Sequence, residues 1–144
     1  MKGLVMEWRE IKNVGDITIL QTEFHYFEDS ILVHYRFESG NYIDKTQIMY
    51  ETNENRLYML FQRLDGNPFS IEILFENVRR MNYFIPFGEN DNWSSELNFA
   101  KIVKNEKYYY WTRWKDFDPN NKEHLNCNDF ILVEAEKVKW RINE

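Results

Sequence analysis

Two histidines, His25 and His34, are the first candidates for chemistry in this sequence, because the expected strand pairing sets them opposite each other. Two imidazoles that face each other across neighbouring strands can bind a transition metal when further ligands converge on them. Glu23 is the only obvious third ligand nearby, and the same pairing sets it opposite Arg36. A stable metal site needs three or four ligands. We therefore interpret the pair as polar residues on an outer face and expect no metal and no cofactor.

The segment that begins with Asp116 and Asp118 imitates the start of a calcium-binding loop, in which oxygen ligands recur at alternate positions. The rest of that motif is missing. Its sixth position is Asn121 instead of glycine, and its twelfth is Cys127 instead of the glutamate that closes a calcium site. We interpret the segment as a turn-rich surface loop.

A cysteine beside a histidine can form a reactive thiolate if the two side chains meet in a cleft, and Cys127 lies three residues after His124. A lone cysteine beside a strand is more often a small, partly buried residue. The chain contains no phosphate-binding glycine loop, no H-E-x-x-H pair and no G-x-S-x-G elbow. Its 24 acidic residues make chance carboxylate pairs common, so no acid–base pair can be named. We expect that the protein is not an enzyme.

Ten short runs with alternating apolar residues must position these side chains, and they predict an all-β protein. The expected strands, mostly antiparallel in a sandwich or a barrel, are residues 5–11, 16–27, 31–38, 42–50, 56–64, 69–78, 80–85, 96–103, 107–114 and 130–142. At most one short helix is expected. A helix would fit the spacing of Trp93, Leu97 and Ala100. Leu97, Phe99 and Val103 alternate nearly as well, so we expect a strand there.

Two hairpins can be predicted residue by residue from the apolar faces of neighbouring runs. The first sets Phe24 opposite Tyr35 across a short turn. The second turns through residues 65–68 and sets Phe61 opposite Ile73. In each hairpin the apolar side chains share one face and the polar side chains share the other.

The last expected strand, 130–142, changes its buried face partway, which indicates a bulge near residues 136–137. After the change, Lys137, Lys139 and Arg141 form an outward basic row. Charged side chains of this kind protect the free edge of a sheet from pairing with another chain. We therefore predict that 130–142 is an edge strand.

Aromatic residues make up 17% of the chain, and they are densest around Trp111. Successive side chains of a strand point to opposite faces. Tyr108, Tyr110 and Trp114 therefore share one face of the expected strand. Tyr109 and Trp111 share the other. One core can cover only one of these faces, so a second layer, a ligand or a partner must cover the other.

Tyrosine and tryptophan supply large, rigid contact area and dominate the energetics of protein interfaces. We therefore predict a contact region on this strand and on the polar loop 116–129 that follows it. The residues predicted to contact a partner are Tyr109, Trp111, Arg113, Asp116 and Asp118. The alternative, that these aromatic residues lie between two packed sheets, stays open.

Composition limits the class of protein and of partner. The length of 144 residues fits a single domain, 1–144. Hydrophobic residues make up 43% of the chain and charged residues 29%, which is typical of a folded protein. A net charge of -6 argues against binding to nucleic acid and favours a basic protein as partner. No stretch approaches the roughly 20 apolar residues of a membrane helix, and we expect no membrane partner. The single cysteine and the acidic start indicate a cytoplasmic protein, and a homodimer stays open.

Four stretches taken in order carry a resemblance to a known group of proteins. They are residues 27–31 (FEDSI), 56–63 (RLYMLFQR), 68–78 (PFSIEILFENV) and 135–142 (AEKVKWRI). With these stretches the chain resembles small uncharacterised all-β proteins of Gram-positive bacteria. Some similar proteins have been proposed as immunity partners of secreted toxins, so the resemblance implies a β fold and an inhibitor that blocks a partner. It carries over no functional residues, because its motifs are strand patterns.

A β-barrel that holds a small apolar ligand is the alternative function. About ten strands rich in aromatic residues could enclose a cavity. A closed pocket of ~300 Å³ or more lined by the aromatic run would favour a ligand. A filled core with an exposed apolar patch would favour a partner protein.

Overall fold

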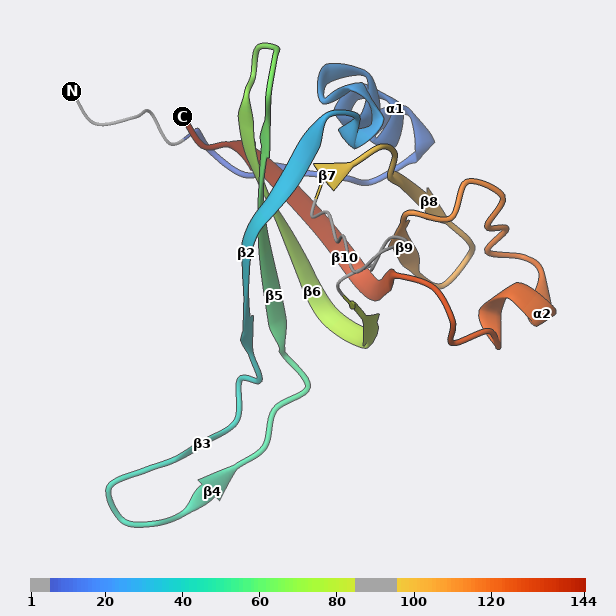
Figure 1. The fold of residues 1–144 in the computed structure, drawn as a ribbon. Helices are drawn as coiled ribbons and strands as arrows, with labels where there is room; N and C mark the ends of the chain where they lie inside the picture. Colours follow the sequence, from blue (N-terminus) through green and yellow to red (C-terminus); the bar gives the residue numbers. More distant parts are fainter. Residues whose placement is uncertain (1–5, 85–95) are drawn as a thin grey trace, which may run out of the picture.

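The computed structural model describes residues 6–84 and 96–144 of the chain (Figure 1). The strands among these residues are β1 (Arg9–Glu10), β2 (Ser30–Glu38), β3 (Tyr42–Ile43), β4 (Met49–Tyr50), β5 (Arg56–Arg63), β6 (Ser70–Asn82), β7 (Glu96–Leu97), β8 (Lys101–Lys104), β9 (Tyr109–Thr112) and β10 (Leu132–Ile142). The helices are α1 (Val14–Glu23), a 3-10 turn (His25–Phe27) and the single-turn α2 (Lys122–Leu125). The predicted all-β class with about ten strands is confirmed. Residue 5 of the first expected strand, residue 85 of the seventh and Trp93 lie outside the described residues.

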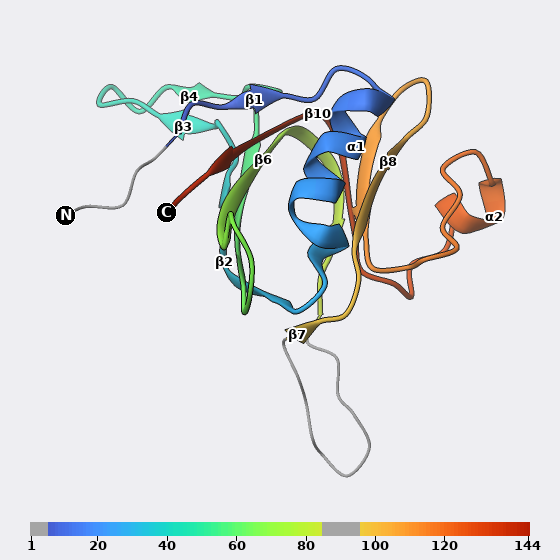
Figure 2. The same ribbon diagram turned by 90° about the horizontal axis from the view of Figure 1, so that it is seen from above.

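One antiparallel sheet forms the body of the molecule. Its strand order is β7-β2-β5-β6-β10-β9-β8, and β1 pairs with the carboxyl-terminal half of β10. The sheet curls into a half-barrel with α1 in its concave face (Figure 2). The β3–β4 hairpin is a separate two-stranded sheet that projects from one end of the body (Figure 1).

The first correction concerns residues 16–27, which form α1 and the 3-10 turn instead of a strand. Asn13 caps the helix, because its side-chain oxygen accepts a hydrogen bond from the Asp16 N–H. Ile17, Leu20 and Phe24 follow at helical spacing and are buried. Ile17 and Ile19 alternate as in a strand, but in α1 Ile17 is buried and Ile19 faces solvent.

The first predicted hairpin is therefore wrong. Tyr35 of β2 lies opposite Met59 of β5 and not opposite Phe24. His25 belongs to the 3-10 turn, while His34 lies in β2. The strand pairing that would have set the two histidines opposite each other does not exist.

The 3-10 turn lets two phenylalanines of one short segment enter the same core. His25, Tyr26 and Phe27 all have positive φ, at 48°, 52° and 62°, which turns the chain sharply after α1. The rings of Phe24 and Phe27 consequently meet edge to face, with centroids 5.3 Å apart. The buried hydroxyl of Ser30 donates a hydrogen bond of 2.6 Å to the Phe27 carbonyl and ties this turn to β2.

Three completely buried rings form the centre of the main core: Phe27, Phe61 and Trp111. Their centroids are 5.0 Å apart for Phe27 and Phe61, 5.4 Å for Phe61 and Trp111, and 5.9 Å for Phe27 and Trp111. Tyr109, on the same face of β9, packs against the edge of this core. The protein's own chain therefore covers this face of the aromatic strand.

A second, smaller core covers the other face of β9. Tyr110, Phe117 and Leu132 are buried there, and the rings of Trp114 and Phe130 contact Phe117. The loop that carries α2 folds back to form this layer, so α1 and α2 lie on opposite sides of β8 (Figure 2). The predicted need for a second layer is thus met within the domain.

The second predicted hairpin exists, but its register differs by two residues. Phe61 lies opposite Ile71 instead of Ile73. The loop centres on Gly66, with φ at 127°, and the Arg63 N–H donates to the Phe69 carbonyl to close it. A shift of two residues keeps every side chain on its predicted face.

β10 is a central strand, so the edge-strand prediction is wrong. It pairs with β6 along one side and with β9 and β1 along the other. The predicted change of face is present, because Ala135 and Val138 enter the same core, and the shift of register lies between Glu134 and Ala135. The basic row binds acidic residues of β6: Lys139 lies 2.8 Å from Glu76, and Arg141 lies 2.6 Å from Glu72.

We expect Trp111→Ala to lower the free energy of unfolding by about 3–5 kcal/mol, because the substitution removes one of three packed rings and leaves a cavity beside the other two. Urea unfolding followed by circular dichroism measures the change. Leu64→Ala, at an 82% exposed position, is the matched control and should change stability by less than about 0.5 kcal/mol. A loss for Trp111→Ala as small as that of the control would contradict the assigned core.

Candidate functional site

His25 lies in the 3-10 turn and His34 in β2, while Asp116 and Asp118 lie in the loop after β9. In the loop after β9, the Asp118 N–H donates to His124 Nδ1 at 3.0 Å, and Asp118 Oδ1 accepts from the Asn120 N–H at 2.9 Å. These bonds close a turn around the Asp118 carboxylate. Within residues 6–84 and 96–144, no group of three or more His, Cys, Asp or Glu side chains is arranged to hold a metal ion.

The predicted contact residues do not form one surface, because β9 divides them. Trp111 is completely buried, so its ring is not available to a partner, and that part of the prediction is wrong. The Tyr109 hydroxyl donates to the Ile11 carbonyl at 2.9 Å, and burial raises the pKa of Tyr109. Asp116 and Asp118 are exposed in the loop that covers the opposite face.

Arg113 lies at the rim of a different surface. Burial raises the pKa of Tyr83, and the positive charge of Arg113 acts against this rise. The Tyr83 ring stacks over Trp111 at 6.5 Å and contacts the Tyr35 ring at 6.2 Å. A continuous series of rings therefore leads from the core to the outside, and Arg113 stands beside it.

Residues 31–50 hold most of the apolar side chains that face solvent. They contribute nine of the 16 large hydrophobic residues that are exposed in the described chain, which is far more than a share by length. These nine are Ile31, Val33, Tyr35, Phe37, Tyr42, Ile43, Ile48, Met49 and Tyr50. This concentration makes the region the candidate binding site.

The first part of the site is the end of the concave face that α1 does not cover, here called the open end: Tyr35, Phe37, Tyr83 and Phe84. Tyr35 and Phe37 lie opposite buried residues of β5, which places them on the concave face, yet each is 51% exposed. Phe84 lies farther along, beside an open hollow of about 540 Å³ that Arg113 also lines. Within residues 6–84 and 96–144, the open end thus extends the main core without being covered.

The second part of the site is the β3–β4 hairpin, residues 39–55, whose apolar side chains point to both of its faces. Tyr42 and Tyr50 are cross-strand partners, and their rings stack with centroids 4.9 Å apart. Ile43 and Met49 form the next pair along the ribbon and, by strand alternation, occupy the other face. They are 62% and 63% exposed. Neither face of this ribbon is covered by the described chain.

Asp44 fixes the turn of the hairpin. Its carboxylate accepts hydrogen bonds from the Thr46 hydroxyl at 2.7 Å, from the Thr46 N–H at 2.8 Å and from the Ile48 N–H at 3.0 Å. Gln47 takes a positive φ of 64°, and its N–H donates to the Asp44 carbonyl. The Thr46 hydroxyl and the Ile48 N–H hold the pKa of Asp44 below its ordinary value.

Asparagine side chains join the hairpin to the sheet. The Asn55 side chain accepts from the Val78 N–H at 2.6 Å and donates to the Val78 carbonyl at 3.1 Å, as a neighbouring strand would. Asn41 Oδ1 accepts from the Thr52 N–H at 2.8 Å across the base of the hairpin. Asparagines also line a polar hollow of about 400 Å³ at this base. The hairpin therefore leaves the body in a defined direction.

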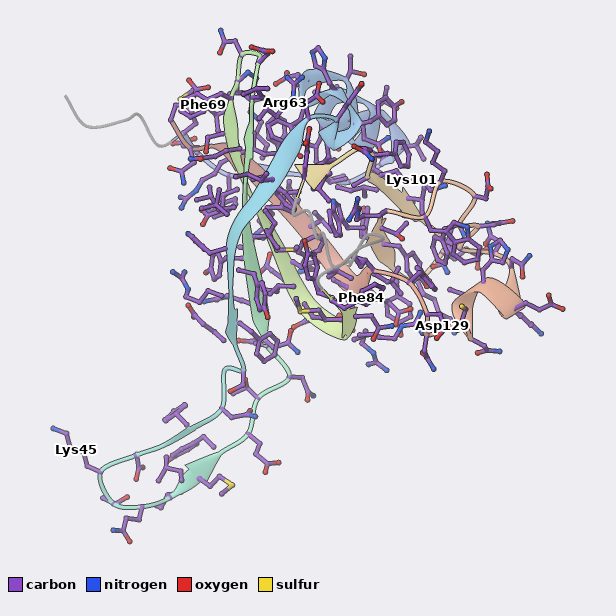
Figure 3. All side chains as sticks on the ribbon, viewed as in Figure 1. Lys45, Arg63, Phe69, Phe84, Lys101 and Asp129 are labelled. Atoms are coloured by element: carbon purple, nitrogen blue, oxygen red, sulfur yellow. The ribbon has the colours of Figure 1, made fainter. Side chains whose placement is uncertain are left out.

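The charge of the hairpin is negative. Residues 39–55 contain three acidic side chains, Asp44, Glu51 and Glu54, and one basic side chain, Lys45, which gives a net charge of -2. Lys45 lies at the far tip, away from the body (Figure 3). Apolar contact area and negative charge thus coincide on one projecting element.

Sequence reasoning missed this site because it placed residues 42–50 in one strand of the sheet. The signal was present in the sequence. Tyr42 and Ile43 are adjacent apolar residues, and Met49 and Tyr50 are another adjacent pair, so a strand through them has apolar side chains on both faces. The same criterion had singled out the run around Trp111. What the pattern does not show is which of the two runs the protein itself covers.

We expect acidification to open the hairpin turn before the body unfolds. Asp44 has a lowered pKa in the folded state, so its bonds contribute stability above the ordinary carboxyl value of 3.8 and lose it as pH falls through the lower folded-state value. The amide resonances of Thr46 and Ile48 measure this by NMR. Asp44→Ala should give the open turn already at neutral pH, and Glu51→Ala, outside the turn, should not. Unchanged Thr46 and Ile48 amides in Asp44→Ala would contradict the assignment.

Tyr110 lies in the smaller core, and Cys127 lies in the loop that follows β9. Burial, with the nearby Glu134 carboxylate, raises the pKa of Tyr110 to about 12, so this hydroxyl stays neutral near pH 7. Cys127 is partly buried, and its N–H donates to the His124 carbonyl.

Across the described ranges, no helix has the length and apolar character needed to cross a bilayer. No family model, curated protein or solved structure matches the chain.

Proposed function

We propose that this protein is a cytoplasmic, non-enzymatic binding protein that acts by docking the open end and the β3–β4 hairpin onto another protein. The observation that carries the proposal is the concentration of exposed apolar side chains between Tyr35 and Tyr50. By the implied resemblance to immunity proteins, the consequence of docking is inhibition of the partner.

The composition of the surface supports a protein partner. Tyrosine is enriched where interfaces gain most of their binding energy, and Tyr35, Tyr42 and Tyr50 are all exposed here. Each buried Å² of apolar surface contributes roughly 25 cal/mol before the costs of association. Exposed apolar patches of this kind mark interaction sites on folded proteins.

The filled core at the α1 end of the concave face favours a protein partner over a small ligand. A ligand-binding barrel needs a cavity at the centre of its sheet. Here Phe24, Phe27 and Trp111 fill the part of the concave face next to α1 and are completely buried. The hollow of about 540 Å³ beside Phe84 is open and lies outside this core.

The charge balance supports a basic partner. A net charge of -6 over 144 residues steers the protein toward positive surfaces and away from phosphates. The same sign of charge on two copies opposes self-association at the acidic hairpin. We therefore place a different, basic protein ahead of a second copy of this chain as the partner.

Capture from the native cell tests the proposal. The immobilised protein should retain one basic protein in a stoichiometric amount, and Tyr35→Ser combined with Phe37→Ser should weaken that capture by roughly tenfold or more. Leu64→Ser is the matched control, because Leu64 is 82% exposed at the opposite end of the sheet.

Three outcomes would overturn the proposal. One is the repeated absence of a stoichiometric partner. Another is equal loss of capture in the control, and the third is a dimer in sedimentation equilibrium that Tyr35→Ser with Phe37→Ser dissociates. If the partner is an enzyme and its activity is unchanged in the complex, the proposed binding role of this protein stands and the proposed inhibition is wrong.

A further inference from the structure

The two faces of the hairpin point to the shape of the partner. Two strands alone bury almost nothing, and Ile43 and Met49 on one face are as exposed as Tyr42 on the other. A flat partner surface would cover one face and leave the second in water. Resting on the proposed function, we infer that the β3–β4 hairpin enters a cleft of the partner as a wedge, and that basic side chains line this cleft around an apolar floor.

The geometry sets the width of such a cleft. A β-ribbon packs against a facing layer at about 10 Å, so a ribbon covered on both faces needs about 20 Å between the opposing backbone layers. The hairpin can reach into that space because it projects from the body and forms its own two-stranded sheet (Figure 1). The open end would then meet the rim of the cleft, and Tyr35 and Phe37 would cover its edge.

The hairpin is held in shape before binding. The Asp44 carboxylate closes the turn, the Tyr42 and Tyr50 rings stack, and the Asn55 side chain fixes the base. A ribbon with this shape in the free protein loses little conformational freedom when it is enclosed. This suits insertion, in which both faces must fit at the same time.

Charge defines the chemistry of the cleft. Glu51 and Glu54 follow the apolar residues on the second arm of the hairpin, and Asp44 lies at the turn. Their enclosure is favourable where positive side chains face them. A cleft lined by positive side chains also attracts polyanions, so the wedge and a polyanion would occupy the same place. A linear polyanion should therefore compete with this protein for its partner.

Photo-crosslinking from each face tests the wedge. Tyr42 and Ile43 are replaced one at a time by p-benzoylphenylalanine, and each variant is illuminated with the protein captured by the unmodified chain. Both positions should crosslink to the same captured protein, and the matched position Leu64 should not. Crosslinks from one face alone would overturn the wedge. So would crosslinks from neither face while Tyr35→Ser with Phe37→Ser still weakens capture. The proposed function would stand in the first case, and in the second it would be limited to docking by the open end.

Charge reversal and competition test the basic cleft. Glu51→Lys with Glu54→Lys should slow association with the captured protein by roughly tenfold at about 50 mM salt and much less at about 500 mM. Glu106→Lys with Glu123→Lys, which makes the same change of charge at two exposed positions outside the hairpin and the open end, is the matched control. Heparin should displace the protein from the complex, and uncharged dextran should not. Unchanged association rates together with no displacement by heparin would overturn the basic cleft.

Discussion

The packing of α1 into only one end of the curled sheet is the constraint on which the rest of the molecule depends. A ten-residue helix is about 15 Å long, whereas the 13-residue strand β6 spans about 40 Å. One such helix cannot cover the whole concave face. Phe24 and Phe27 fill the end near α1 by contacting Phe61 and Trp111, and beyond Trp111 the rings of Tyr83 and Tyr35 continue the core toward solvent.

The same constraint explains why the aromatic strand is internal and the hairpin is not. β9 lies beside the end of the sheet that α1 fills, so the face of β9 that carries Trp111 is buried in the main core. The loop after β9 covers the other face, because its Phe117 packs against Tyr110. The chain after β9 thereby serves the convex side. No described segment remains to cover the open end. Tyr35 and Phe37 at that end are followed directly by the β3–β4 hairpin. The uncovered end of the core and the projecting hairpin are therefore neighbours in the chain.

Local pattern predicts much of this fold because strand alternation is a local property. Most of the strands, and the two faces of β9, follow from the sequence, as does the opposing burial of Tyr110 and Trp111. α1 was missed because Ile17 and Ile19 imitate a strand, and only contact with the sheet decides that Ile17, Leu20 and Phe24 form the buried face.

Other features depend on contacts between distant segments. A basic row such as that of β10 fits an edge strand and a central strand equally well in the sequence. Only the ion pairs with Glu72 and Glu76 of β6 show that the strand is central. The location of the candidate site depends on the same kind of information. Two runs with apolar residues on both faces differ only in whether another part of the chain reaches them, and that is set by topology. Trp111 and Tyr42 could not be told apart on this point from their neighbours in sequence.

An exposed apolar ribbon is a hazard as well as a binding element, because a free strand can pair with other chains. The hairpin limits this hazard in two ways. Its strands β3 and β4 have only two residues each, which is too short to template a long sheet. Its net charge of -2 also repels the same element of another copy. Neither property weakens contact with a positive cleft. The short strands and the negative charge thus oppose self-association, and the proposal of a basic protein over a second copy of the chain rests on them.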